Sequence, residues 1–218
     1  MRASFTWDKD MVRTAYLNNQ DAFSALARTQ TSEPNVIFVL SGSYALPFFA
    51  KSPAVVRSIL GGWNMNAIFR KSTGYLVPAP TGAFSSGVNP KLPNPTYSQW
   101  FNTCTLNASG LRTNCANSNQ PVAWTIQPPF TLNQFISNYS YLPGIRSNIP
   151  PTIDLSLFKR FALWESGNLE FRAEAYNFTN TPAFGYPNTS VTSSSFGLVT
   201  LTQTNDPRLI QLGLKLNF

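Results

Sequence analysis

The last eleven residues of the chain are RLIQLGLKLNF at 208–218, and from Ile210 onwards they alternate between apolar side chains and polar or small ones. The apolar positions are Ile210, Leu212, Leu214 and Leu216, and the chain ends on the aromatic Phe218. A period of two puts successive side chains on opposite faces of a β-strand, so this stretch predicts a strand with one wholly apolar face. Chain ends are ordinarily frayed and polar, so an apolar terminus needs a reason in its surroundings.

The same period of two recurs along the chain and predicts an all-β, antiparallel fold. The predicted strands span about 4–14, 36–46, 62–73, 152–162, 168–178 and 207–218. Helical patterning occurs only in the short stretches 20–28 and about 53–60. No apolar run approaches the roughly 18 residues of a membrane-spanning helix.

The connections between the predicted strands alternate in length. Those at about 46–63 and 161–169 are the shorter ones, whereas those at about 15–35, 74–151 and 179–207 are long. Outer-membrane barrels have short periplasmic turns and long external loops. The pattern therefore favours a transmembrane β-barrel over 1–218, with 74–151 as a long extracellular loop.

Charges of both signs fall on the polar faces of the predicted strands, where they can form cross-strand ion pairs and line a hydrated lumen. These lumen-facing charges are Asp154, Arg160, Glu170, Arg172, Glu174 and Lys215. The apolar faces suit contact with lipid. A secreted or surface β-sandwich that binds or adheres remains an alternative, because a sandwich also alternates, and so does a passive porin-like barrel.

If the last residue lies in the periplasm, the direction of every strand follows, and five aromatic residues gather at the periplasmic boundary. They are Tyr44, Trp63, Phe161, Trp164 and Phe218. Amphipathic rings favour that depth. Lys159 is the one charge on an apolar face, and the same direction places it where its amine can extend to the headgroups.

The composition argues against most enzymatic and nucleic-acid functions. Charged residues make up 11% of the chain, which contains no histidine, so triad-type hydrolases and most zinc enzymes lack their usual base or ligand. The net charge of +7 comes from scattered residues rather than a basic cluster, so nucleic acid is not an expected partner. Glu170 and Glu174 fit a charge ladder better than an acid/base pair. Neither catalysis nor a cofactor is expected.

Two features of the 74–151 loop carry further predictions. Cys104 and Cys115 favour a disulfide in an oxidising compartment, with two unrelated thiols or an incomplete metal site as alternatives. Aromatic residues of the loop either contact a ligand by ring stacking or pack the loop against itself and the rim. The candidate ligand-contacting residues are Trp100, Trp124, Tyr139 and Tyr141.

Several segments resemble TonB-dependent outer-membrane receptors of the Oar-like type, which often carry a carboxypeptidase-regulatory-like domain and abound in acidobacteria. The segments are FTWDKDM at 5–11, VIFVLSGSYALPF at 36–48, ILGGWNMNAIFRKSTGYLVP at 59–78, WFNT at 100–103, PPTIDLSLFKRF at 150–161, ESGNLEFRAEAYNFTNTPAFGYPN at 165–188, FGLVT at 196–200 and DPRLIQLGLKLNF at 206–218. They follow one another in the order expected for the family.

The resemblance implies a cell outer membrane location of the Gram-negative type and the C-terminal part, about six strands, of a barrel of about 22 strands. It further implies uptake of a bulky nutrient (a saccharide, peptide or siderophore) powered through TonB. An N-terminal plug and the other strands would then be missing here. Leu214, Leu216 and Phe218 resemble the C-terminal signal read by the barrel assembly machinery.

Overall fold

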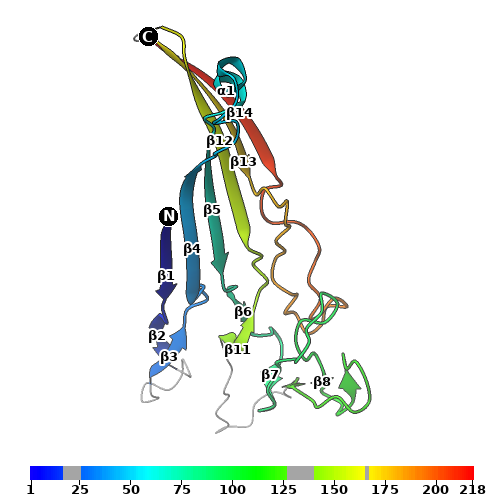
Figure 1. Ribbon diagram of the computed structural model, residues 1–218. Coiled ribbons are helices and arrows are strands. Elements are labelled where there is room, and N and C mark those ends of the chain that lie inside the picture. The colour runs from blue at the N-terminus through cyan, green and yellow to red at the C-terminus, as the bar shows by residue number, and fades with distance from the viewer. Residues whose placement is uncertain (17–25, 127–139, 165–166) are drawn as a thin grey trace.

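The computed structural model describes residues 1–16, 26–126, 140–164 and 167–218, and its main element is a six-stranded sheet (Figure 1). The strand order is β1-β4-β5-β12-β13-β14, and every neighbouring pair is antiparallel. The strands are β1 Arg2–Trp7, β4 Val36–Ala45, β5 Asn64–Ser72, β12 Thr152–Ala162, β13 Asn168–Tyr176 and β14 Leu209–Asn217. The predicted all-β, antiparallel class is confirmed, whereas this sheet is not closed into a barrel.

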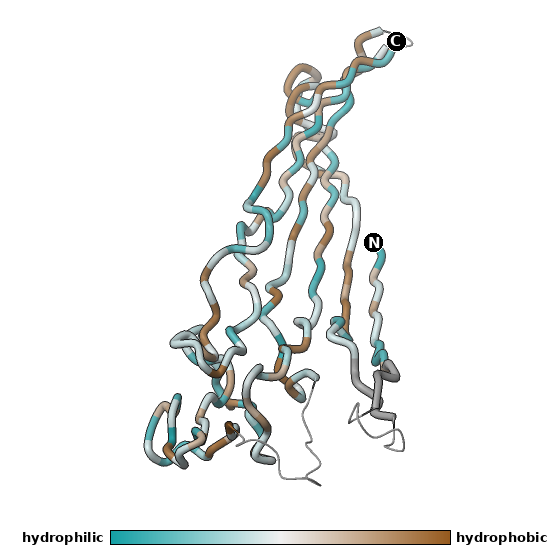
Figure 2. Tube along the Cα trace, turned by 180° about the vertical axis from the view of Figure 1, so that it is seen from behind, coloured by the Kyte–Doolittle hydropathy of each residue, from teal (hydrophilic) through white to brown (hydrophobic). Residues whose placement is uncertain are grey.

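The pairing register keeps the two faces of the sheet distinct from strand to strand. Leu157 lies opposite Ala173, and Ala173 lies opposite Leu212. On the other face, Arg160 lies opposite Glu170, which lies opposite Lys215. Directly paired residues share a face, so apolar and polar side chains alternate along the strands as the sequence indicates (Figure 2).

The first predicted strand, 4–14, differs from the structure, which has two strands there. β1 ends at Trp7, and β2 (Met11–Tyr16) pairs with β3 (Leu26–Gln30) in a separate two-stranded sheet. Asp8-Lys9-Asp10 separates them, and this charged tripeptide interrupts the alternation that defines a strand with one apolar face. Residues 26–28 of the segment 20–28, which carries a helical pattern, lie in β3, and 20–25 lie outside the described residues.

One end of the sheet carries the shorter connections, the single helix of the described residues and the C-terminus (Figure 1). Helix α1 (Ala54–Leu60) lies between β4 and β5, as the pattern around 53–60 predicts. Gly61 ends it with extended backbone and donates its N–H to the Arg57 carbonyl at 3.0 Å. A Cβ at position 61 would lie 2.7 Å from that carbonyl oxygen, so this close approach requires glycine.

The opposite end of the sheet carries the long connections, which contain short strands of their own (Figure 1). β6 (Leu76–Pro78) and β11 (Tyr141–Arg146) pair beyond β5 and β12. A four-stranded sheet follows with the order β7-β10-β8-β9, and its β10–β8 pair is parallel. Its strands are β7 Phe84–Ser85, β8 Thr105–Leu106, β9 Arg112–Thr113 and β10 Trp124–Thr125.

The buried apolar core of the described residues lies in these long connections and not in the large sheet. It contains Val77, Ala83, Phe101, Ala123, Trp124, Leu142, Ile145, Val191 and Phe196. Seven of these residues belong to the 74–151 loop, and the last two belong to the connection between β13 and β14. Two long connections therefore share one core, and we call this unit the loop cap.

Candidate functional site: a two-faced sheet beneath a loop cap

The apolar face of the large sheet is open to its surroundings in the described structure. Leu212 and Leu214 on β14 are 68% and 69% exposed. On inner strands, Phe38 and Phe69 meet edge to face with ring centroids 6.2 Å apart. Water-soluble monomers rarely expose so large a contiguous apolar surface. Because the residues of this face carry almost no polar atoms, lipid is the environment that matches it.

The polar face carries a row of ion pairs centred on Glu170. Arg160 Nε lies 2.8 Å from one carboxylate oxygen of Glu170, and Arg172 Nη2 lies 2.9 Å from the other. Arg172 Nη1 also lies 3.4 Å from Glu174. The Arg160–Glu170 pair crosses from β12 to β13, whereas both Arg172 contacts stay within β13. The charged residues therefore compensate one another along this face.

The remaining two predicted lumenal charges lie on the same face without joining this row. Asp154 accepts a 2.9 Å hydrogen bond from the backbone N–H of Asn177, so it holds the end of β13. Lys215 lies opposite Glu170 on β14, and within the described residues it has no carboxylate partner within 4.0 Å.

Lys159 behaves differently from the sequence prediction. Its side chain is only 4% exposed and does not extend to the headgroups. The amine instead donates to the carbonyls of Ser58 at 2.6 Å and Ile59 at 3.0 Å, and also to that of Gly61. The carbonyls at a helix C-terminus lack helical partners and carry partial negative charge. Helix α1 covers Lys159 and supplies those acceptors. The alternating pattern of the strands does not show where this helix packs, so the prediction for Lys159 missed it.

Four of the five predicted boundary aromatics lie on or beside the strands near α1. Trp63 packs edge to face on Phe171 with centroids 5.8 Å apart, and Lys159 Nζ lies 4.8 Å from the ring centroid of Phe161. Trp164 follows β12 and is 51% exposed, and Tyr44 is near the end of β4. The fifth, Phe218, is 94% exposed at the chain end (Figure 1).

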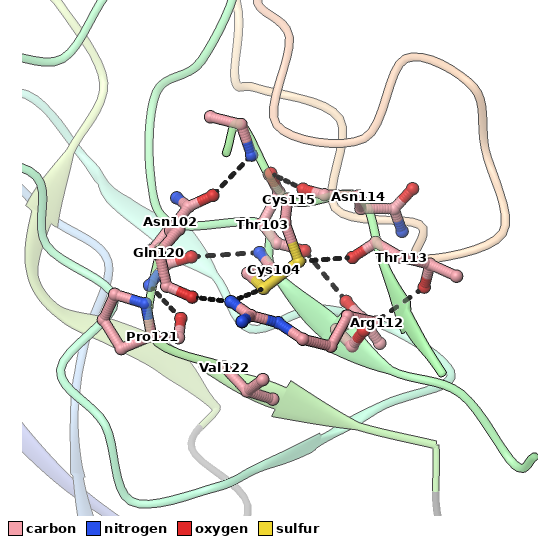
Figure 3. Close-up of a disulfide and its surroundings, with 12 residues drawn as sticks. Asn102, Thr103, Cys104, Arg112, Thr113, Asn114, Cys115, Gln120, Pro121 and Val122 are labelled. Atoms are coloured by element: carbon pink, nitrogen blue, oxygen red, sulfur yellow. Dashed lines mark hydrogen bonds between the residues drawn. A yellow bond between two sulfur atoms is a disulfide. The ribbon is translucent and has the colours of Figure 1, made fainter. Parts of the chain in front are cut away.

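A disulfide joins Cys104 and Cys115 within the loop cap (Figure 3). Arg112 lies across it and donates to the carbonyls of Ser118 and Gln120. The buried Asn102 accepts from the Cys104 N–H at 2.9 Å. These bonds fix the 102–122 segment as a compact lobe, and no signal in the sequence pointed to Asn102 or Arg112.

The four candidate ligand aromatics have different surroundings. Trp124 is 1% exposed and donates its indole N–H to the Asn102 carbonyl at 2.6 Å, so it belongs to the cap core and offers no ligand surface. Trp100 is half-buried and donates to the Arg146 carbonyl at 2.9 Å. Tyr141 is half-buried on β11. Tyr139 lies outside the described residues.

Beside Trp100 lies an aromatic set that also contains Tyr97 of the same loop and Phe184, which the sequence did not single out. Tyr97 stacks on the Trp100 ring at 5.7 Å, and Phe184 from the β13–β14 connection meets Tyr97 edge to face at 5.2 Å. The Tyr97 hydroxyl accepts a 3.0 Å hydrogen bond from the Asn148 amide. Tyr97 remains 37% exposed, so the set presents part of this aromatic side chain to the outside.

All three long connections are tied together by hydrogen bonds. Arg146 donates to the carbonyls of Glu33 at 3.2 Å and Gly74 at 2.7 Å. Its partial burial lowers the pKa of this guanidinium without neutralising it near neutral pH, since arginine titrates far above that range. The Asn114 amide donates to the Val191 carbonyl at 3.2 Å and so joins the disulfide lobe to the β13–β14 connection.

Within 1–16, 26–126, 140–164 and 167–218, no group of three or more His, Cys, Asp or Glu residues could hold a metal ion. Among the same residues, no helix has the length and apolarity to cross a membrane.

Comparison with protein families gives one match, to a family described as an outer membrane beta barrel domain, over residues 1–211. Comparisons with curated proteins and with solved structures gave no significant match. The match covers all of β1 to β13 and the start of β14, so it takes in both the two-faced sheet and the loop cap. The chain therefore belongs to the outer membrane beta barrel domain family and is located in the cell outer membrane.

Proposed function

We propose that the chain forms part of the barrel wall of a TonB-dependent transporter that takes up a bulky nutrient through the outer membrane. The observation that carries the proposal is the ion-paired row on one face of a sheet whose other face is apolar. A barrel that moves a polar nutrient needs a hydrated lumen on one side and lipid on the other. The Oar-like resemblance adds the coupling to TonB.

A larger barrel is part of the proposal, because the sheet has two outer strands. β1 and β14 each have one neighbour within the described sheet. A barrel removes such edges by pairing its last strand with its first. Further strands are the partners that this arrangement calls for, and the Oar-like resemblance adds an N-terminal plug and, through the plug, the TonB complex.

The nutrient classes that fit the loop cap are saccharides, peptides and siderophores. Tyr97, stacked on Trp100, supplies a partly exposed ring of the kind that stacks on sugar rings or flat chelates. Tyr141 and Tyr139 belong to the same loop. We assign no catalytic role and no cofactor, because Glu170 and Glu174 are both paired with Arg172.

Two further partners follow from the faces of the sheet and from the chain end. Membrane lipid would cover the apolar face. The barrel assembly machinery would recognise the C-terminal residues Leu214, Leu216 and Phe218, of which Phe218 is free of packing at 94% exposure.

The test is uptake of a labelled oligosaccharide, oligopeptide or ferric siderophore by cells of the source organism. We expect deletion of the gene to abolish uptake of one of the three, and deletion of TonB or collapse of the proton gradient to abolish it equally. Uptake that needs the gene but survives loss of TonB would identify a passive porin-like barrel and overturn the coupling. Uptake of all three without the gene would overturn the transport proposal for these nutrients.

A further inference from the structure

The connection between β4 and β5, residues 46–62, exposes several large apolar side chains at the short-loop end of the sheet. Val55 and Ile59 on α1 are 70% and 56% exposed. Leu60 is exposed as well, and so are Phe48 and Phe49 ahead of the helix. Phe49 has a φ of 60°, in the left-handed region that a bulky residue rarely adopts. The fold thus holds apolar groups outward where a water-facing turn would be polar.

The helix lies on the apolar side of the sheet. Lys159 shares its face with Leu157 and Phe161, because side chains two residues apart on a strand point the same way. Its amine reaches the carbonyls of Ser58, Ile59 and Gly61 at the end of α1. Trp63, directly after the connection, packs on Phe171 of that same face. Helix α1 therefore lies over the apolar side of the sheet, the side proposed to face lipid.

The charges of the connection are all positive. Its only ionisable side chains are those of Lys51 and Arg57, both exposed, and the sequence LPFFAKSPAVVRSILGG contains no acidic residue. Within α1, Val55 and Ile59 are one helical turn apart, whereas Arg57 and Ala54 fall on the other side. An apolar face beside isolated cations is the pattern of a helix lying in a membrane interface, with its cations at lipid phosphates.

We propose that residues 46–62 form a membrane foot: an interfacial segment that inserts Phe48, Phe49, Val55 and Ile59 into the periplasmic leaflet and holds anionic phospholipid with Lys51 and Arg57. Outer-membrane barrels place their short connections in the periplasm, which fixes the leaflet. Lys159 is the positioning residue, because it fastens α1 to the wall. The inference depends on the outer-membrane location of the chain and not on the transported nutrient.

The first test measures depth with a nitroxide on single introduced cysteines, the native pair being held in its disulfide. The full chain is reconstituted in vesicles of phosphatidylethanolamine and phosphatidylglycerol. We expect a label at Ile59→Cys to collide frequently with oxygen, which dissolves in lipid, and rarely with a water-soluble nickel chelate. A label at Leu212→Cys on β14 is expected to behave in the same way. A label at Ala54→Cys, on the other side of α1, is the matched control and stays accessible to nickel.

The outcomes separate the membrane foot from the barrel itself. A Leu212→Cys label in lipid with an Ile59→Cys label in water overturns the membrane foot alone. An Ile59→Cys label shielded from both oxygen and nickel shows that protein covers α1, which also overturns it. If neither label is in lipid, the sheet has not inserted into the vesicles. The same experiment is then run in outer membranes isolated from the producing cells. There, an Ile59→Cys label in lipid supports the membrane foot and one in water overturns it.

The second test concerns the charges. The preference of the reconstituted protein for spin-labelled phosphatidylglycerol over phosphatidylcholine is compared between the native chain and a Lys51→Gln/Arg57→Gln variant. We expect the preference to fall by up to about fivefold per charge removed. Lys91→Gln, an exposed lysine of the long external loop, is the control and leaves the preference unchanged. An unchanged preference in the double variant overturns the lipid-phosphate role.

Discussion

Lys159 shows how a single charge becomes compatible with an apolar surface. Its amine donates to three backbone carbonyls at the end of α1, and the ring of Phe161 lies 4.8 Å away. A charge held by so many oriented dipoles does not need water to be stable. The residue therefore joins the sheet to a helix that contributes no buried residue of its own.

We expect Lys159→Met to lower the free energy of unfolding by about 2–4 kcal/mol, because hydrogen bonds from a charged donor are lost and carbonyls are left unpaired. Denaturant unfolding in detergent micelles, followed by tryptophan fluorescence, measures the change. Lys215→Met is the matched control and is expected to stay within about 0.5 kcal/mol, as substitutions away from such contacts do. Equal effects of the two variants would contradict the role given to Lys159.

Glu170 makes more ion-pair contacts than the neighbouring carboxylate Glu174 on the same strand face. It accepts from both Arg160 and Arg172 at under 3 Å, whereas Glu174 has one guanidinium contact, at 3.4 Å, and a 3.3 Å hydrogen bond from the Tyr176 hydroxyl. We expect Glu170→Gln to lower the unfolding midpoint more than Glu174→Gln, because it leaves two guanidinium groups facing each other. Raising the salt concentration should narrow the difference, since ions screen exposed charges. The reverse order of midpoints would show that the row is not centred on Glu170.

At the scale of the elements, the junction of the sheet with the loop cap depends on a close backbone approach. A Cβ at Gly74 would lie 1.7 Å from the Ser147 carbonyl oxygen, between the β5–β6 and β11–β12 segments. We expect Gly74→Ala to destabilise the protein by about 3 kcal/mol, the upper end of the cost of overpacking. Gly185→Ala is the control, because its Cβ would meet only Thr204 at 3.8 Å. Denaturant unfolding of both variants tests this, and a tolerated Gly74→Ala would refute the tight junction.

The disulfide lobe is the second element whose stability can be separated from that of the sheet. The bridge closes a short loop with a sequence separation of 11. By the chain-entropy account, such a bridge contributes about 2–3 kcal/mol. We expect the Cys104→Ser/Cys115→Ser variant to be cut by protease within 102–122 at a higher rate, while the strands of the large sheet stay protected. Mass spectrometry of the fragments measures this, and cleavage within β12–β14 instead would mean that the lobe is coupled to the whole sheet.

At the scale of the whole molecule, the last residue of the sequence is exposed and not packed. Phe218 is 94% exposed, so its removal costs the described fold little. We expect deletion of Phe218 to reduce the amount of protein in the outer membrane without changing the unfolding midpoint of the protein that does assemble. Fractionation with immunoblotting measures the amount, and Leu201→Ala in an external connection is the control for losing one exposed apolar side chain. An unchanged amount would remove Phe218 from the assembly signal.

The sequence by itself determined the strands of the large sheet and the residues that share each face. Alternation is a local property of the chain, because successive side chains of any strand point to opposite sides. That is why it could be predicted, before any strand pairing was known, that Leu212 and Leu214 lie on one face of the sheet and Lys215 on the other. The Asp8-Lys9-Asp10 break interrupts that period, and there the prediction of one continuous strand was wrong.

Only the tertiary structure decided the contacts that join segments far apart in the chain. Trp124 in the cap core, Lys159 beneath α1 and Arg146 on the Glu33 carbonyl all depend on partners that no periodic pattern connects to them. Their acceptors are backbone carbonyls, which every residue type has. The sequence therefore does not indicate which carbonyl will accept each hydrogen bond. The face of a side chain follows from its own strand, whereas its partner follows from how the loops fold over the end of the sheet.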